Sequence, residues 1–137
     1  MYLLDTNIIS SVARDSNGPV GRMLRKVDPD FVVTNTVVAC EIRFGLAKTP
    51  ESRNAARAVD FMETLTVVPL EPEVALQYAK TRAWLVAKGL GIGANDLLIA
   101  AHAMTIDATV VTDDGAFYTI PGLKVENWLR DEPAVHE

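Results

Sequence analysis

The first ten residues (1–10) read MYLLDTNIIS, and they place a polar DTN triplet between two apolar stretches. Tyr2–Leu4 has the length and composition of a short buried strand, and Asn7–Arg14 has those of a helix. All three residues of the triplet are types that cap the starts of helices. A carboxylate directly after a buried strand, as Asp5 is, also stands where ligands bind at the edge of a parallel sheet. The rest of the chain must decide between these two interpretations.

Short apolar strands and longer helical segments continue to alternate along the chain. Such alternation predicts an α/β fold in which helices cover both faces of a mainly parallel sheet of four or five strands. Further strands are predicted at Phe31–Thr34, Thr66–Leu70, Thr109–Thr112 and Leu123–Val125. Helices are predicted at Val20–Val27, Thr36–Ala47, Glu51–Leu65, from the EPEV segment to about Lys88 with Pro72 near its first turn, and at Ala94–Ile106, the last apolar on all sides.

Length and composition are typical of a single globular domain. The chain has 137 residues, of which 49% are apolar and 23% charged, and we expect one domain over residues 1–130 with a polar tail at 131–137. No apolar run approaches the ~18 residues of a membrane span, and no basic region precedes an apolar stretch as in a secretory signal. The single cysteine, Cys40, cannot form an internal disulfide, so a cytoplasmic protein is expected. We expect Cys40 itself to be a small core residue.

Acidic residues follow strands that should share one edge of the sheet. Asp5 follows the first strand, and Asp113 and Asp114 follow the fourth. Asp96 stands in the first turn of the most apolar helix. Each acid alone has a plain structural explanation, since Asp96 suits a helix start and the DDG segment suits a turn.

Glu41 is the most informative of the acids. On the predicted helix Thr36–Ala47 it shares i, i+4 spacing with Val37 and Phe44-Gly45, which predicts a carboxylate on the apolar face. A buried carboxylate without a partner costs several kcal/mol. A buried ion pair or a neutral glutamic acid is the alternative explanation.

Four carboxylates meeting at one edge need a common explanation. Two like charges ~4 Å apart repel by roughly 4 kcal/mol at an effective dielectric constant of 20. Such a cluster therefore requires a cation or shared protons. Because His and Cys are absent from the set, a hard ion such as Mg²⁺ or Mn²⁺ is favoured. The set is Asp5, Glu41, Asp96 and Asp114.

Four segments, in order along the chain, resemble the PIN-domain ribonucleases, and most closely the VapC/FitB-type toxins of bacterial toxin–antitoxin pairs. They are LLDTNIIS, ACEIRFGLA, GIGANDLLIAAHA and VVTDDGAFYTIPGLKVENW. The resemblance implies an α/β/α sandwich and a Mg²⁺- or Mn²⁺-dependent endoribonuclease. By motif, the catalytic and metal-binding acids are Asp5, Glu41, Asp96 and Asp114, with Asp113 in the variable place.

The resemblance also implies further properties of the site and its partners. Thr6 and Thr112 match polar residues that line family sites. Many relatives carry Arg about where this chain has Thr119, so that support is absent or comes from Arg43, Arg82 or Lys88. Attack by water on RNA, a cognate antitoxin and homodimerisation are implied. The net charge of −5 argues against a nucleic-acid partner, but the four acids account for most of it.

Other functions remain open at this stage. A PIN-fold module that binds without catalysis would keep the same fold. A phosphatase using Asp5 as nucleophile commonly needs a second Asp two residues later, where this chain has Asn7. A receiver-like domain would need an acceptor Asp after the third strand, where Pro69-Leu70-Glu71 stands. We expect His102, inside the apolar helix without a second His or Cys at ligand spacing, to be packed or hydrogen bonded.

Overall fold

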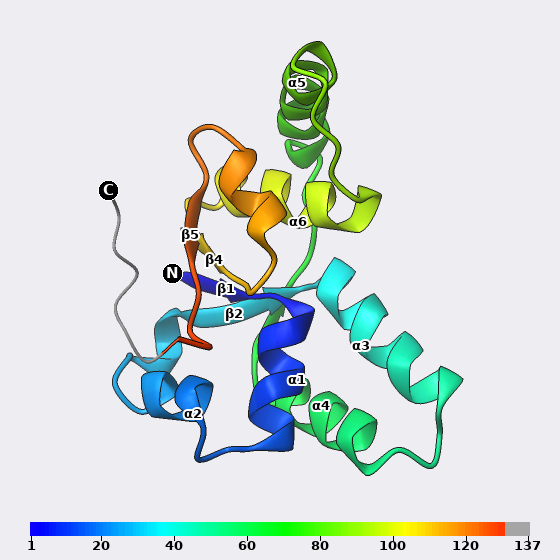
Figure 1. Ribbon diagram of the computed structural model, residues 1–137, viewed down its shortest axis with the longest axis vertical. Helices are drawn as coiled ribbons and strands as arrows, with labels where there is room; N and C mark the ends of the chain where they lie inside the picture. The colour runs from blue at the N-terminus through cyan, green and yellow to red at the C-terminus, as the bar shows by residue number, and fades with distance from the viewer. Residues whose placement is uncertain (131–137) are drawn as a thin grey trace.

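The computed structural model describes residues 1–130 as a five-stranded, entirely parallel sheet between layers of helices (Figure 1). The strands are β1 (Tyr2–Leu4), β2 (Val32–Asn35), β3 (Thr66–Val68), β4 (Thr109–Val111) and β5 (Lys124–Glu126), in the order β3-β2-β1-β4-β5. The α/β class and the parallel sheet predicted from the sequence are confirmed. The predicted tail at 131–137 lies outside the described residues.

In the described part of the chain, six α-helices connect and cover the strands. Figure 1 shows α5 and α6 on one side of the sheet and α1, α2 and α4 on the other. The helices are α1 (Thr6–Arg14), α2 (Pro19–Leu24), α3 (Thr36–Lys48), α4 (Arg53–Glu63), α5 (Val74–Ala87) and α6 (Ala94–Thr105). Within residues 1–130, none of them is long and apolar enough to cross a bilayer.

The centre of the sheet is the most deeply buried part of the molecule. β1 lies between β2 and β4, with Leu3 opposite Val33 on one side and Val110 on the other. Leu3 and Leu4 are fully buried, as expected for a strand covered on both faces. The prediction that α6 is buried on most sides is confirmed, since Leu97, Ile99, Ala100, Ala101, His102 and Ala103 are all buried.

Several elements are shorter than predicted, for local reasons. β3 ends at Val68 because Pro69, which has no N–H, follows it. α5 begins at Val74, so Pro72 precedes the helix instead of standing in its first turn. α4 covers Arg53–Glu63 because Ser52 caps its start through a hydrogen bond to the Ala55 N–H. A 3₁₀ turn at Pro29–Phe31 delays β2 to Val32.

Candidate active site

Asp5 lies at the end of the central strand and is only 3% exposed. Its Oδ1 accepts a hydrogen bond from the Thr6 N–H (2.8 Å), so it does cap α1. Its Oδ2 accepts from the Thr112 hydroxyl (2.8 Å), which β4 places beside it. Burial raises the pKa of Asp5, although these hydrogen bonds oppose the rise. Asp5 therefore both caps α1 and belongs to the acidic site.

Asp114 reaches the site from the loop after β4, as predicted in preference to Asp113. Its backbone N–H donates to the Thr112 hydroxyl (3.0 Å), and its Oδ1 caps a short 3₁₀ turn by accepting from the Ala116 N–H (2.9 Å). The Asp113 carboxylate instead accepts from Asn127 (2.8 Å) and is exposed. Asp114 therefore does stabilise the turn, as its DDG segment suggested, but only through Oδ1. Its second carboxylate oxygen, Oδ2, does not take part in the turn.

Asp96 is the residue on which the other acids act. Its pKa is raised to about 7 by burial, by the charge of Asp5, by a hydrogen bond and charge from Asp114, and by the charge of Glu41. Four elements distant in sequence therefore bring these carboxylates close enough to interact. The N-cap of α6 is Gly93, and no side chain caps this helix. A side-chain cap by Asp96 is therefore ruled out, although its place in the first turn of α6 still suits the helix dipole.

Glu41 joins the cluster by a different route from the predicted one. Its Oε1 accepts from the Thr6 hydroxyl (2.9 Å), which ties α3 to the start of α1. The buried residues of α3 are Val38 and Ile42, whereas Glu41 is half-buried and Phe44 is exposed. The predicted apolar face of α3 was therefore wrong, although Glu41 does face the other acids. Cys40 is exposed for the same reason, contrary to expectation.

Asn7, considered from the sequence only as a possible helix cap and as the place where a phosphatase would need a second Asp, has a further structural role. Its Oδ1 accepts from the Asp113 N–H (3.0 Å), while its Nδ2 lies 3.4 Å from both Asp5 Oδ2 and Thr112 Oγ1. It therefore fixes the loop after β4 against the start of α1. Its only sequence signal is its place in the DTN triplet, between apolar residues.

A second amide links the two helices that carry Glu41 and Asp96. Asn35 caps α3 by accepting from the Val38 N–H (2.9 Å), and its Nδ2 lies 3.0 Å from His102 Nδ1 on α6. Burial lowers the pKa of His102, so the neutral ring accepts this hydrogen bond. His102 is packed and hydrogen bonded, as expected.

The cations proposed to replace the missing arginine have other partners. Arg43 pairs with Glu63 (2.6 Å) on the exposed side of α3 and α4. Arg82 lies against Tyr78, and Lys88 over Trp84. Thr119 itself donates to the Ala116 carbonyl (2.7 Å) at the end of the 3₁₀ turn. Within residues 1–130, these contacts of the four residues are made to groups other than the four acids.

The donor chemistry of the cluster fits a hard divalent cation. All four side chains offer oxygen atoms, the ligands that such cations prefer. Asp96 lies close enough to the other acids for their charges to raise its pKa. Within residues 1–130, no three or more His, Cys, Asp and Glu side chains are already arranged to hold a metal ion. Hydrogen bonds from Thr6, Thr112 and the Ala116 N–H aim several of the oxygens. Holding an ion would therefore require side-chain rotation and loss of the Asp96 proton.

The free energy of unfolding is expected to fall as pH rises from 6.5 to 8, above the range in which the lowered pKa of His102 acts in the opposite direction. Folded Asp96 has a pKa of about 7, whereas an unperturbed aspartate has one of 3.8. Between these values the folded protein binds more protons than the unfolded chain, so stability is lost as pH rises through 7. The raised pKa of Asp5 acts in the same direction. Urea unfolding in EDTA at four pH values measures this, and a midpoint that rises toward pH 8 would contradict it.

Comparison with known proteins agrees with this fold. The model of the PIN domain matches residues 2–123. Ribonuclease VapC2 of Rickettsia felis is 30% identical over 93% of this chain and 98% of its own length, and Ribonuclease VapC2 of Haemophilus influenzae is 32% identical over the same shares. The crystal structure of VapBC2 from Rickettsia felis bound to a promoter DNA fragment superposes with a TM-score of 0.84, covering 93% of this chain and 98% of that one.

The chain therefore belongs to the PIN-domain family. Within that family, its match to VapC2 extends over nearly the full length of both chains, which places it in the VapC branch. The resemblance that the four sequence segments suggested is confirmed.

Proposed function

We propose that this chain is the toxin of a toxin–antitoxin pair, a Mg²⁺- or Mn²⁺-dependent endoribonuclease that acts on RNA in the cytoplasm. The observation that carries the proposal is the mutual interaction of Asp5, Glu41, Asp96 and Asp114, which four separate elements contribute. The names of its relatives support the same activity. They include Ribonuclease VapC2 and a tRNA(fMet)-specific endonuclease VapC of Salmonella typhimurium, 28% identical over 93% of this chain and 97% of its own length.

Each acid has a distinct part in the proposed reaction. Asp5 and Asp96 would be the principal ligands of the ion, and Asp114 would complete the set. Such an ion, when bound, neutralises charge on the phosphate and acidifies water. Glu41, oriented by the Thr6 hydroxyl, would serve as a ligand or accept the proton of the attacking water. Thr112 and Asn7 hold the Asp5 carboxylate in place. Hydrolysis by water leaves a 5′-phosphate and a 3′-hydroxyl.

A cognate antitoxin is the protein partner in this proposal. The structures of VapBC2 from Rickettsia felis and of FitAB bound to a DNA fragment resemble this chain, the second with a TM-score of 0.81 at 29% identity over 98% of this chain and 99% of that one. An antitoxin with a basic side chain would complement the acidic site. Homodimerisation is also part of the proposal, and exposed Leu76 and Val86 on α5 support an interface there.

Metal-dependent RNA cleavage tests the proposed function. Purified protein incubated with total RNA should produce new 5′-phosphate ends in Mg²⁺ or Mn²⁺, and EDTA should abolish them. Undiminished cleavage in EDTA would reject the mechanism. Intact RNA in Mg²⁺ would favour a binding module without catalysis, and an aspartyl-phosphate trapped on Asp5 would favour a phosphatase.

A further inference from the structure

A buried hydrogen bond joins the two helices that carry Glu41 and Asp96. Asn35 Nδ2 lies 3.0 Å from His102 Nδ1, and the two residues are 0% and 1% exposed. Asn35 ends β2 and caps α3, whereas His102 lies in the second half of α6. The two helices also pack against each other. The bond therefore connects the start of one helix to the buried interior of the other.

The cap of α3 fixes which atoms of this pair donate and accept. Asn35 Oδ1 accepts from the Val38 N–H (2.9 Å), so the NH₂ group of the amide is the part that faces His102. An NH₂ group only donates, so His102 Nδ1 is the unprotonated acceptor and Nε2 carries the ring proton. A protonated ring would turn a second N–H toward the amide. The geometry therefore accepts only the neutral Nε2–H form.

Stability alone does not account for this polar pair. His102 Nε2 is buried and has no hydrogen-bond partner within residues 1–130. A buried donor without a partner is unfavourable, and two apolar side chains of similar shape would avoid that loss. Ile99 and Ala103, close to His102 on α6, are apolar and fully buried. What the pair adds is direction, because a hydrogen bond constrains the relative orientation of two helices more strictly than apolar contacts do.

Glu41 and Asp96 each stand six residues from this bond. Glu41 follows Asn35 along α3, and Asp96 precedes His102 along α6. At 1.5 Å per residue each acid lies about 9 Å along its helix from the bond, so a rotation of about 10° between the helices moves one acid relative to the other by about 1.5 Å. Functional groups must be held to within about 0.5 Å. The angle between α3 and α6 therefore decides whether both acids can act together.

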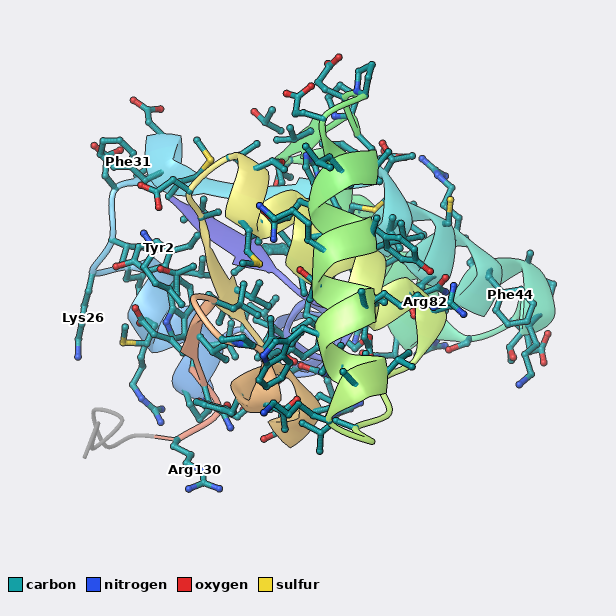
Figure 2. The ribbon with its side chains drawn as sticks, turned by 90° about the horizontal axis from the view of Figure 1, so that it is seen from above. Tyr2, Lys26, Phe31, Phe44, Arg82 and Arg130 are labelled. Carbon is teal, nitrogen blue, oxygen red and sulfur yellow. The ribbon has the colours of Figure 1, made fainter. Side chains whose placement is uncertain are left out.

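The rest of α3 is held by contacts to other helices. The Thr6 hydroxyl binds Glu41 from α1, and Arg43 pairs with Glu63 on α4. Figure 2 shows Phe44 on the arm that α3 and α4 form outside the body of the molecule. These contacts orient α3 relative to α1 and α4, and none of them orients it relative to α6.

We propose that Asn35 and His102 are positioning residues of the acidic site: their hydrogen bond sets the angle between α3 and α6 and with it the separation of Glu41 from Asp96. The inference rests on the proposed metal-dependent ribonuclease function and deepens it. It makes the geometry of the acids depend on a buried pair that touches neither an ion nor RNA.

Four substitutions test this role. Asn35→Ser still caps α3, because serine is as good an N-cap as asparagine, but its shorter side chain does not reach His102. His102→Leu removes the acceptor, whereas His102→Asn keeps an acceptor at the place of Nδ1. Thr81→Val is the matched control, since it removes a different buried hydroxyl, which accepts from Gln77 (3.0 Å) within α5.

Residual dipolar couplings measured by NMR in EDTA report the angle between α3 and α6. Asn35→Ser and His102→Leu should change this angle by about 10° or more, the range that a functional site does not tolerate. His102→Asn and Thr81→Val should keep the wild-type angle. A measurement on the wild type needs no variant to fold: ¹⁵N spectra should show the neutral Nε2–H form of His102 at pH 7, and a charged or Nδ1–H ring would overturn the proposal.

Metal binding and cleavage connect the angle to the site. Asn35→Ser and His102→Leu should weaken Mn²⁺ binding in calorimetry about tenfold. At saturating Mn²⁺ they should lower kcat by ten- to a hundredfold with the KM for RNA unchanged, as expected when groups behind metal ligands are lost. The double variant should lose no more than either single one, because both act through one bond. His102→Asn and Thr81→Val should behave like the wild type.

The outcomes separate this proposal from the function on which it rests. A wild-type angle in Asn35→Ser and His102→Leu overturns the proposal whether or not the protein cleaves RNA. A changed angle with unchanged Mn²⁺ affinity and kcat also overturns it and leaves the ribonuclease intact, as does an equal loss in Thr81→Val. If the wild type neither binds Mn²⁺ nor cleaves RNA, the proposed function fails, and the angle alone decides the role of the pair.

Discussion

Asp5→Asn is expected to reduce RNA cleavage by about a thousandfold while leaving the fold intact. The carboxylate is 3% exposed and lies where β1, β4 and α1 meet, so it is held in place before any substrate binds. Removing one charge from a preorganised polar site typically costs two to three orders of magnitude in rate. Asparagine has the same shape and still offers Oδ1 to the Thr6 N–H. Single-turnover cleavage of a short RNA in Mg²⁺ measures the loss.

Thermal unfolding distinguishes a catalytic effect from a folding defect. Because burial raises the pKa of Asp5, the neutral amide should leave the melting temperature unchanged or higher in EDTA. Asp113→Asn is the matched control, since it removes an adjacent acid whose carboxylate contacts Asn127 instead, and it should cleave like the wild type. An Asp5→Asn enzyme that retains wild-type cleavage would refute the role of Asp5.

The architecture was predictable because the spacing of apolar residues indicates which faces of strands and helices are buried, and because residues that favour turns mark where these elements end. Leu3 and Leu4 belong to a short strand buried on both faces, and the continuous apolar surface of α6 marks it as central. What the pattern missed were boundaries set by single residues. Pro69 ends β3, and Ser52 fixes the start of α4. The buried face of α3 was misjudged because that helix buries Val38 and Ile42 and exposes Phe44.

The acids of the site were predictable to different degrees. Asp5 and Asp114 follow parallel strands, so topology alone brings them to one edge of the sheet. Glu41 was found by its motif and by a spacing argument whose premise about the buried face was wrong. Asn7 and Asn35 hold parts of the site in place through contacts with residues far along the chain, Asp113 and His102. No periodicity in a single sequence reports such contacts.

Asp96→Asn is expected to separate stability from metal binding. In EDTA at pH 8 the wild-type carboxylate is forced to ionise beside Asp5, Asp114 and Glu41, against a pKa of about 7. Asparagine removes this repulsion, so the urea midpoint of the variant should equal or exceed that of the wild type, and its decrease between pH 6.5 and 8 should be smaller. The N-cap of α6 is Gly93, so no capping interaction is lost.

Addition of Mg²⁺ should reverse the order of the two proteins. An ion that binds only the folded state stabilises it by about 2.7 kcal/mol at 100 times its dissociation constant, and the variant lacks a principal ligand. The wild type should also release about half a proton on binding at pH 7, because a group with a pKa near 7 is half protonated there. Calorimetry in buffers of different ionisation enthalpy measures that proton, and Asp113→Asn should match the wild type. A large loss of stability of Asp96→Asn in EDTA, or equal stabilisation of both proteins by Mg²⁺, would show that Asp96 serves the helix and not an ion.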